Sequence, residues 1–196
     1  SHIKPNLMNI QNECWNCNTP YHSFKYFCNQ CKKILKPILA NAFEHFDIKP
    51  DISIDLNQLE MDYYEIQVKI HPDKFVGLSD EELLYAQIHS SNLNNSYQIL
   101  KNIVSRCDEL LKISGIESSN ETTISDPEVL NEVMTIQEKL ESINDEDRKV
   151  LMPEIKEKLK IYIESLELAF KIQDFEKLKV LKTKITYYEK VIKDLR

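Results

Sequence analysis

Four of the five cysteines form two pairs whose spacing is typical of a metal site. The pairs are Cys14-x2-Cys17 and Cys28-x2-Cys31, separated by ten residues, while Cys107 stands alone far downstream. Each short turn brings two thiolates to one point, and the intervening residues allow the two turns to face each other. Together they supply the tetrahedral set of four sulfur ligands that zinc favours. We therefore predict one structural Zn²⁺ bound by these four paired cysteines.

Other chemistry is compatible with the same residues. Two local disulfides, or an iron or iron–sulfur site on the same four sulfurs, are the alternatives, and His22 could replace one cysteine. An odd cysteine count with tight pairs favours a reducing compartment over a disulfide framework. Because the segment has few apolar residues, metal binding would contribute most of its folding free energy. Asn18 follows the first pair, where such a turn often needs a left-handed residue.

A second polar group, His71-Pro72-Asp73, lies between two segments with helical periodicity. Asp55 is a suitable N-cap for a helix over Leu56–Ile70, and proline disfavours helical geometry at the residue before it. Ser79 or Asp80 as the N-cap, with Glu82 near the N3 position, then favours the start of another helix. The sequence thus predicts a short bend that carries an imidazole, an imino ring and a carboxylate between two helices.

The rest of the chain also indicates helices. Only two glycines occur among 196 residues, and long stretches run between helix breakers, which favours an all-α fold. We expect a first helix over 38–46, another apolar helical stretch over 103–113, and a polar linker over 116–125. Asp126 followed by Pro127 is typical of an N-cap and a first helical residue.

Three stripes of apolar residues at near-heptad spacing follow this linker. They predict an antiparallel three-helix bundle over 126–196. The middle helix should reach about Gln173, and its start near Pro153 is not defined by the pattern. Leu130 and Met134 lie about 100–140° away from the apolar stripe of the first helix, which is typical of a partner surface, although a wide core could also bury them.

Composition excludes several functions. The net charge is −7, and residues 1–40 carry five lysines against Glu13, a balance of +4 that falls to about +2 with four thiolates and Zn²⁺. A general nucleic-acid binder needs a more concentrated basic face. No apolar run is long enough to cross a bilayer. No nucleophile with a neighbouring base appears, Cys107 included, and no glycine loop could hold phosphate, so we expect no enzyme activity.

Several blocks of sequence, in order, carry a resemblance to a known family. The chain resembles the J-domain proteins over about residues 41–196, and within them the HscB-type co-chaperones of iron–sulfur cluster assembly. Eukaryotic members often add an N-terminal four-cysteine module with a Cys-Trp-Asn-Cys turn. The matching blocks are Cys14-Trp15-Asn16-Cys17, Ala42-Phe43-Glu44-His45-Phe46, His71-Pro72-Asp73-Lys74-Phe75, residues 92–101, residues 110–115 and Asp126-Pro127-Glu128-Val129-Leu130.

The resemblance implies an all-α protein with a zinc-binding module (1–37), a J-domain (38–115), a linker (116–125) and a C-terminal three-helix bundle (126–196). It implies that the J-domain binds a DnaK-type chaperone and stimulates its ATPase, while the bundle delivers an IscU-type iron–sulfur scaffold protein for cluster transfer. The residues implied for chaperone binding are Lys69, His71, Pro72, Asp73 and Lys74. Those implied for scaffold binding are Leu130, Met134, Glu138 and Tyr187.

Two departures from the family pattern affect these expectations. Asn131, Thr135 and Ser142 stand where relatives commonly place an apolar or acidic residue, so scaffold binding could be weaker or differently tuned. The helix before the bend usually carries a basic face, but this one has Asp62 and Val68 at commonly basic positions. Attraction to an acidic chaperone should therefore be reduced, with Lys74 carrying more of it.

Other functions remain open at this point. The chain could serve a J-protein role for a different client, or act as a zinc-ribbon adaptor for nucleic acid, which the small positive charge disfavours. We expect no nucleic-acid or membrane partner, and a monomer or weak dimer. The resemblance implies the mitochondrial matrix, with the cytoplasm as an alternative. Because the sequence starts at Ser1 rather than at a methionine, the lack of a leader carries little weight.

Overall fold

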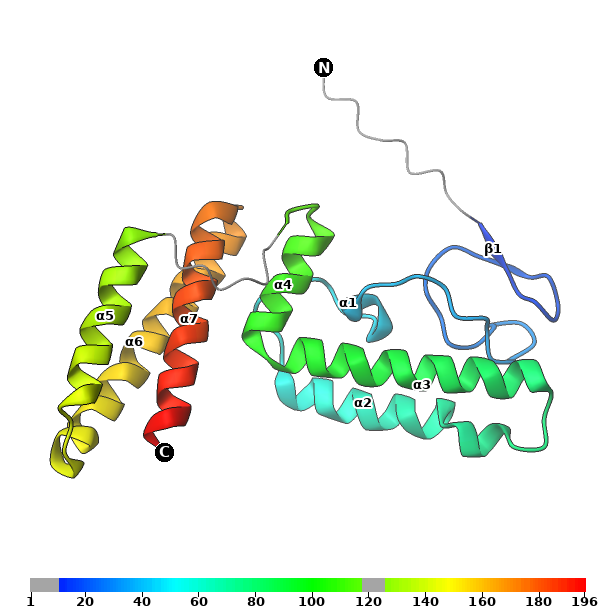
Figure 1. Ribbon diagram of the computed structural model, residues 1–196. Coiled ribbons are helices and arrows are strands. Elements are labelled where there is room, and N and C mark those ends of the chain that lie inside the picture. Colours follow the sequence, from blue (N-terminus) through cyan, green and yellow to red (C-terminus); the bar gives the residue numbers. More distant parts are fainter. Residues whose placement is uncertain (1–10, 118–125) are drawn as a thin grey trace, which may run out of the picture. The chain divides into compact units, whose positions relative to one another are not determined.

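The computed structural model describes residues 11–117 and 126–196 (Figure 1). The first ten residues of the predicted zinc module and most of the predicted linker lie outside the described residues. Packing divides the chain into two compact units. Among the described residues, the first unit consists of residues 11–50 and 54–101, and the second of residues 51–53, 102–117 and 126–196.

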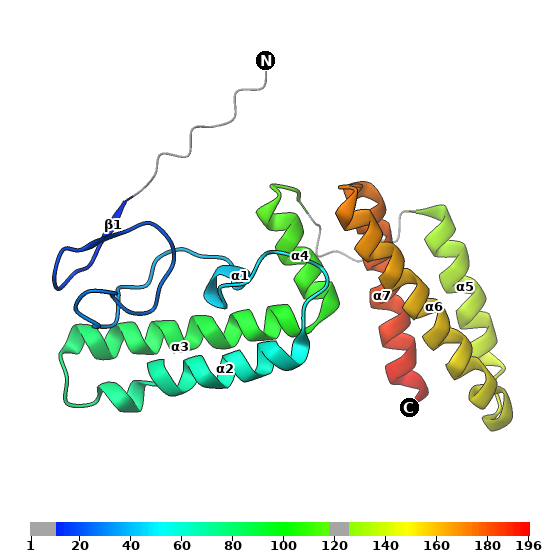
Figure 2. The same ribbon diagram turned by 180° about the vertical axis from the view of Figure 1, so that it is seen from behind.

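The first unit contains a small metal-module fold and a helical hairpin. Its elements are β1 (Asn12–Glu13), β2 (Pro20–Tyr21), α1 (Ala42–His45), α2 (Leu56–Ile70), η1 (Pro72–Phe75, a 3₁₀ helix) and α3 (Asp80–Lys101). The two strands pair antiparallel. Helices α2 and α3 run side by side in both views (Figures 1 and 2), and Tyr63 stacks on Tyr97 with ring centroids 4.3 Å apart.

The hairpin is fixed by local capping that the sequence predicts. Asp55 accepts a hydrogen bond from the backbone N–H of Gln58 (3.0 Å) at the start of α2. At the start of α3, Ser79 Oγ accepts from the N–H of Glu82, whose carboxylate accepts from the N–H of Ser79 in return. This reciprocal pair is a capping box. The predicted bounds of α2 are confirmed, and α3 starts where its caps predict.

The expectation of a first helix over 38–46 is wrong in its extent. The helix α1 begins at Ala42, because Asn41 caps it and Glu44 returns a hydrogen bond to the backbone N–H of Asn41. Leu39, which an amphipathic helix would bury, is fully exposed. Residues 38–40 therefore lie outside the helix.

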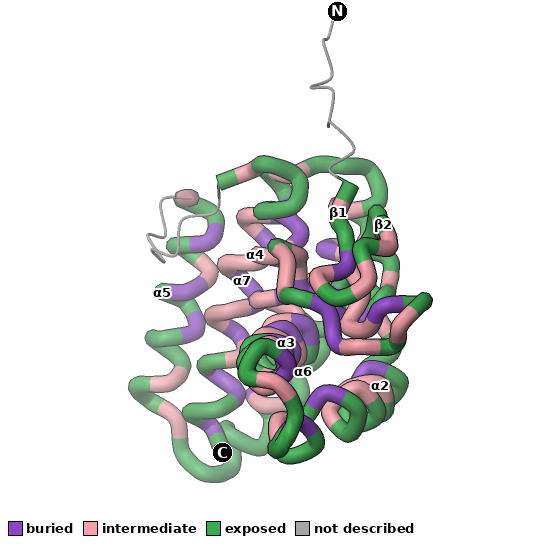
Figure 3. Tube along the Cα trace, turned by 90° about the vertical axis from the view of Figure 1, so that its right-hand side faces the viewer, coloured by how far each residue is buried: buried purple, intermediate pink, exposed green. Residues whose placement is uncertain are grey.

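The second unit contains α4 (Ile103–Ile113), α5 (Pro127–Glu141), α6 (Asp145–Lys171) and α7 (Phe175–Leu195). Buried residues recur along the inward stripes of these helices, as the purple segments of α5 show in Figure 3. Lys182 of α7 forms an ion pair with Asp108 of α4, at 2.5 Å. By packing, α4 therefore groups with the bundle, while the predicted limits of the J-domain stay a prediction.

Pro153 lies inside α6 rather than at its start. Asn144, nine residues earlier, caps the helix by accepting a hydrogen bond from the N–H of Asp147. Pro153 is exposed while its neighbours Leu151 and Ile155 are buried, so packing on both sides of the proline holds the helix continuous. No helix in the described ranges combines the length and apolar character that a membrane span requires.

Candidate functional site

The four paired cysteines converge on one point. Their sulfur atoms all lie within 4.8 Å of one another, and all four thiols are free. Cys14 Sγ lies 3.7 Å from Cys31 Sγ, and Cys17 Sγ lies 3.6 Å from Cys28 Sγ. A disulfide requires about 2.05 Å, whereas a tetrahedral site with metal–sulfur bonds of about 2.3 Å separates sulfurs by about 3.8 Å. The geometry therefore excludes disulfides between these pairs and fits a metal ion.

Each cysteine pair is held by the same backbone arrangement. The N–H of Cys14 donates to the carbonyl of Thr19, and the N–H of Cys28 donates to that of Lys33, both at 2.9 Å. The residues after the pairs, Asn18 and Lys32, have φ of 60° and 64°. The left-handed conformation predicted at Asn18 is confirmed, and it costs least for asparagine among residues with a side chain. His22 is exposed and does not belong to the cysteine group.

The thiols are unequal in the absence of a metal. Burial raises the pKa of Cys14 to about 11. Hydrogen bonds from the Thr19 side chain and backbone lower the pKa of Cys17 to about 6. A bound cation would stabilise all four thiolates together, so the site is suited to a thiolate-preferring ion.

The HPD loop, His71-Pro72-Asp73, is exposed between α2 and α3. The side chains of His71 and Asp73 are 53% and 90% exposed. The N–H of Asp73 donates to His71 Nδ1 (3.2 Å), and a carboxylate oxygen of Asp73 lies 3.6 Å from the same nitrogen. Lys74 donates its backbone N–H to the carbonyl of His71 at 3.0 Å and closes the turn. The predicted exposed bend is confirmed.

The helix α2, which precedes the HPD loop, carries little positive charge on its exposed face. Lys69 forms an exposed pair with Glu65 at 3.3 Å. Large apolar side chains project from the same helix: Met61, Tyr64 and Val68 are each at least 60% exposed. The outward face of α2 therefore carries apolar and acidic side chains and little positive charge, and the weakly basic character predicted from its sequence is confirmed.

On the bundle, the structure brings the predicted surface residues together. Leu130 and Met134 are 43% and 50% exposed on α5, and Glu138 is exposed one turn further on. Tyr187 of α7 donates its hydroxyl to the carbonyl of Val133 at 3.4 Å, which places its ring beside this part of α5. Neither leucine nor methionine is buried in a wide core. Their roles stay a prediction, because position alone identifies no partner.

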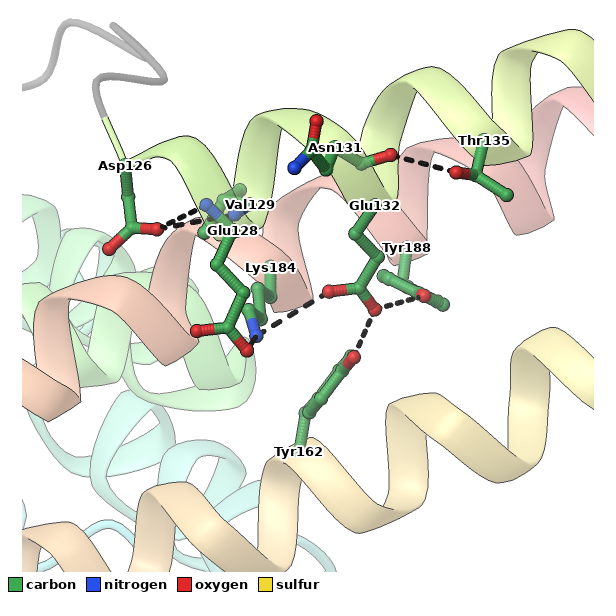
Figure 4. Close-up of polar contacts among 9 residues, drawn as sticks. All are labelled: Asp126, Glu128, Val129, Asn131, Glu132, Thr135, Tyr162, Lys184 and Tyr188. Carbon is green, nitrogen blue, oxygen red and sulfur yellow. Dashed lines mark hydrogen bonds and ion pairs between the residues drawn. The ribbon is translucent and has the colours of Figure 1, made fainter.

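A polar cluster between the bundle helices, in which Tyr188 and Lys184 are buried, was not predicted from the sequence (Figure 4). Glu132 accepts hydrogen bonds from the hydroxyls of Tyr162 and Tyr188, and its carboxylate lies 3.4 Å from Lys184 Nζ. Burial alone would raise the pKa of Glu132, but the two phenols and Lys184 outweigh burial and hold it below its usual value. The cluster joins α5, α6 and α7.

The missed signal was the position of Lys184. This lysine lies within the apolar stripe of the last helix, between Leu181 and Tyr188, and it is buried. A lysine at such a position requires an acidic partner. Glu132 and Glu128 on the preceding bundle helix were the available candidates.

Comparisons with known proteins agree with this architecture. The family model described as "HSCB C-terminal oligomerisation domain" matches residues 125–196. The human iron-sulfur cluster co-chaperone protein HscB is 32% identical over 91% of this chain and 78% of its own length. An Arabidopsis thaliana homologue of it is 30% identical over 93% of this chain and 72% of its own.

Solved structures give the same result. The crystal structure of human co-chaperone protein HscB superimposes with a TM-score of 0.85 and 30% identity, covering 94% of this chain and 96% of that one. The Vibrio cholerae chaperone HscB shares the fold at 24% identity, with a TM-score of 0.72.

An exposed HPD loop on a helical hairpin, followed later in the chain by a three-helix bundle, defines a J-domain co-chaperone of this type. The four-cysteine centre adds the metal module predicted from the sequence. With two relatives matched over most of their length, the chain belongs to the HscB family.

Proposed function

We propose that this protein stimulates the ATPase of a DnaK-type chaperone through its HPD loop and presents to it an IscU-type scaffold protein bound on the bundle. The observation that carries the proposal is the solvent exposure of His71 and Asp73 at the tip of a capped hairpin. A loop held outward by two helices keeps its donors and acceptors available to another protein. Lys69 and Lys74 would add the positive charge on this side.

The bundle surface supports the second half of the proposal. Leu130 and Met134 expose apolar area next to Glu138, and Tyr187 lines the same part of the bundle. Exposed apolar residues edged by an acid are typical of a protein interface. The iron–sulfur function is carried by the names of the human and Arabidopsis relatives. The mitochondrial matrix is the location that we propose on this basis.

An ATPase assay tests both halves. Purified protein is added to a DnaK-type chaperone with and without an IscU-type scaffold, and steady-state phosphate release is measured. We expect stimulation by the protein alone and greater stimulation when scaffold is present. Stimulation that the scaffold leaves unchanged, combined with no scaffold binding at tens of micromolar, would assign the protein to a different client.

We further propose that the metal is one structural Zn²⁺. The four-sulfur donor set and the spacing of its atoms support a tetrahedral, thiolate-preferring ion. Elemental analysis of protein purified without added metal tests this assignment. One equivalent of zinc is expected, and an absorbing iron centre would contradict it.

A further inference from the structure

The metal module and the HPD loop share one buried cluster. Ile34 of the module, Phe75 of η1 and Ala86 of α3 pack together and are 1%, 7% and 0% exposed. Phe27, Leu83 and Tyr85 pack around this cluster. From His71 to Leu78, Phe75 is the one buried residue. The loop is therefore anchored to the protein by a single buried side chain, part of whose packing surface comes from the metal module.

The cysteine site fixes the part of the module that contacts Phe75. Phe27 and Ile34 form an antiparallel β-bridge that flanks the second cysteine turn. Phe27 directly precedes Cys28, and Ile34 follows Cys31 by three residues. A metal bound to these sulfurs would therefore hold the small hairpin whose ends carry both apolar side chains.

A second contact reaches the other side of the loop. Lys33 Nζ lies 3.3 Å from Glu82 Oε1. The second oxygen of Glu82 accepts from the backbone N–H of Ser79 (3.1 Å) and from its hydroxyl (2.9 Å). The side chain of Glu82 is only 8% exposed, so the carboxylate of this ion pair is shielded from solvent. Adjacent module residues thus hold both Phe75 and the start of α3.

We propose that the metal module positions the HPD loop, so that occupancy of the four-cysteine site controls how well the loop docks. Ile34 and Lys33 are positioning residues, because they act through Phe75 and Glu82 rather than through contact with the docking partner. This inference rests on the docking role proposed above for the loop. Loss of the metal would release the hairpin, remove packing from Phe75 and let the turn that ends at Lys74 open.

Amide hydrogen exchange of the full chain, followed by NMR, tests the positioning directly and needs no chaperone. The variants are Ile34→Ala and the conservative Ile34→Val, with Phe24→Ala as matched control. Phe24 belongs to the same module but contacts the rings of His45 and His89 instead of Phe75. Each is measured with the metal bound and after chelation.

We expect Ile34→Ala, or chelation, to speed exchange of the Lys74 and Leu78 amides about tenfold or more. Ile34→Val should stay near the parent protein, and Phe24→Ala should leave these two amides unchanged. The amide of Cys28, which bonds to the carbonyl of Lys33, reports whether the module itself has opened. Fast exchange at Cys28 with unchanged exchange at Lys74 and Leu78 would overturn the proposal.

A chaperone assay gives the functional consequence. Ile34→Ala should raise the concentration needed for half-maximal ATPase stimulation while leaving the maximum unchanged, and Ile34→Val should restore it. Lys33→Met should act in the same direction, with the exposed Lys32→Met as control. If the parent protein does not stimulate the chaperone ATPase, the docking function proposed above is wrong. The hydrogen-exchange data alone then test whether the metal module positions the loop. Parent-like stimulation by an Ile34→Ala variant with a loosened loop would contradict positioning.

Discussion

The Nε2 atom of His89 lies 2.7 Å from the carbonyl oxygen of Leu35, joining α3 to the metal module. Because Nε2 must donate to this oxygen, Nδ1 holds a lone pair, and that nitrogen is buried without a hydrogen-bond partner among the described residues. Phe24 and Tyr26 approach the ring edge-on. Burial lowers the pKa of His89 to about 4, with His45 contributing in the same direction. The imidazole is therefore neutral at pH 7.

This neutrality predicts a loss of stability in mild acid. The unfolded chain takes up a proton near pH 6.5, whereas the folded His89 resists protonation until about pH 4. The stabilisation is fully present above pH 6.5 and is lost as the pH falls through this window, by about 3 kcal/mol in total. His89→Gln, which can still donate to Leu35, should flatten the pH dependence. Urea unfolding at several pH values between 4 and 7.5, monitored by the fluorescence of Trp15, measures the free energy of unfolding as a function of pH.

The exposed His22→Gln is the control for that experiment, because it makes the same substitution at a solvated position. It should leave the pH dependence unchanged. Equal slopes in the parent and His89→Gln proteins would show that another group carries the acid sensitivity.

The HPD loop predicts a variant that separates folding from docking. Because the Asp73 side chain is 90% exposed, Asp73→Ala should change the free energy of unfolding by no more than about 0.5 kcal/mol. ATPase stimulation should fall to the level of the chaperone alone. Asp80→Ala, an exposed acid on the next helix, is the control and should stimulate normally. Full stimulation by Asp73→Ala would remove the docking role.

The polar cluster of the bundle predicts a destabilising isosteric change. Glu132→Gln would remove the charge that faces Lys184, whose side chain is 10% exposed, and weaken two phenol hydrogen bonds. We expect a loss of about 1–3 kcal/mol in the free energy of unfolding. Glu128→Gln should cost far less, because Glu128 is 81% exposed although it pairs with the same lysine. Thermal unfolding monitored by circular dichroism compares the two.

The surface of α5 predicts loss of scaffold binding without loss of fold. Leu130→Ala combined with Met134→Ala removes apolar area that is about half exposed, so the bundle should keep its stability within about 1 kcal/mol. Affinity for an IscU-type scaffold should fall at least about tenfold. Calorimetric titration measures the change, and Val150→Ala, an exposed apolar residue on α6, is the control. Unchanged affinity would place the scaffold elsewhere.

Local chemistry explains which elements could be predicted. Asp55 and Ser79 cap their helices through backbone N–H groups three residues away, so the local sequence contains the information that defines these starts. The four cysteines could be grouped because their spacing and donor type suffice. Pro153 is different, since its tolerance inside α6 depends on packing of Leu151 and Ile155 against other helices.

Contacts between distant segments could not be predicted. Ile34 and Phe75 are far apart in the chain, and neither belongs to a periodic pattern that would pair them. The part of the loop's anchor that comes from the metal module could therefore not be read from the sequence. The acidic partner of Lys184 was similarly hidden, because its choice depends on helix orientation.

The outward face of α2 has a consequence for kinetics. With Met61, Tyr64 and Val68 exposed and Lys69 beside Glu65, this helix provides little long-range pull on an acidic partner. Encounter in the proposed complex should then proceed at roughly 10⁵–10⁶ M⁻¹s⁻¹, rather than at the much faster rates that charge steering allows. A high affinity for the chaperone would then have to come from slow dissociation rather than from fast association.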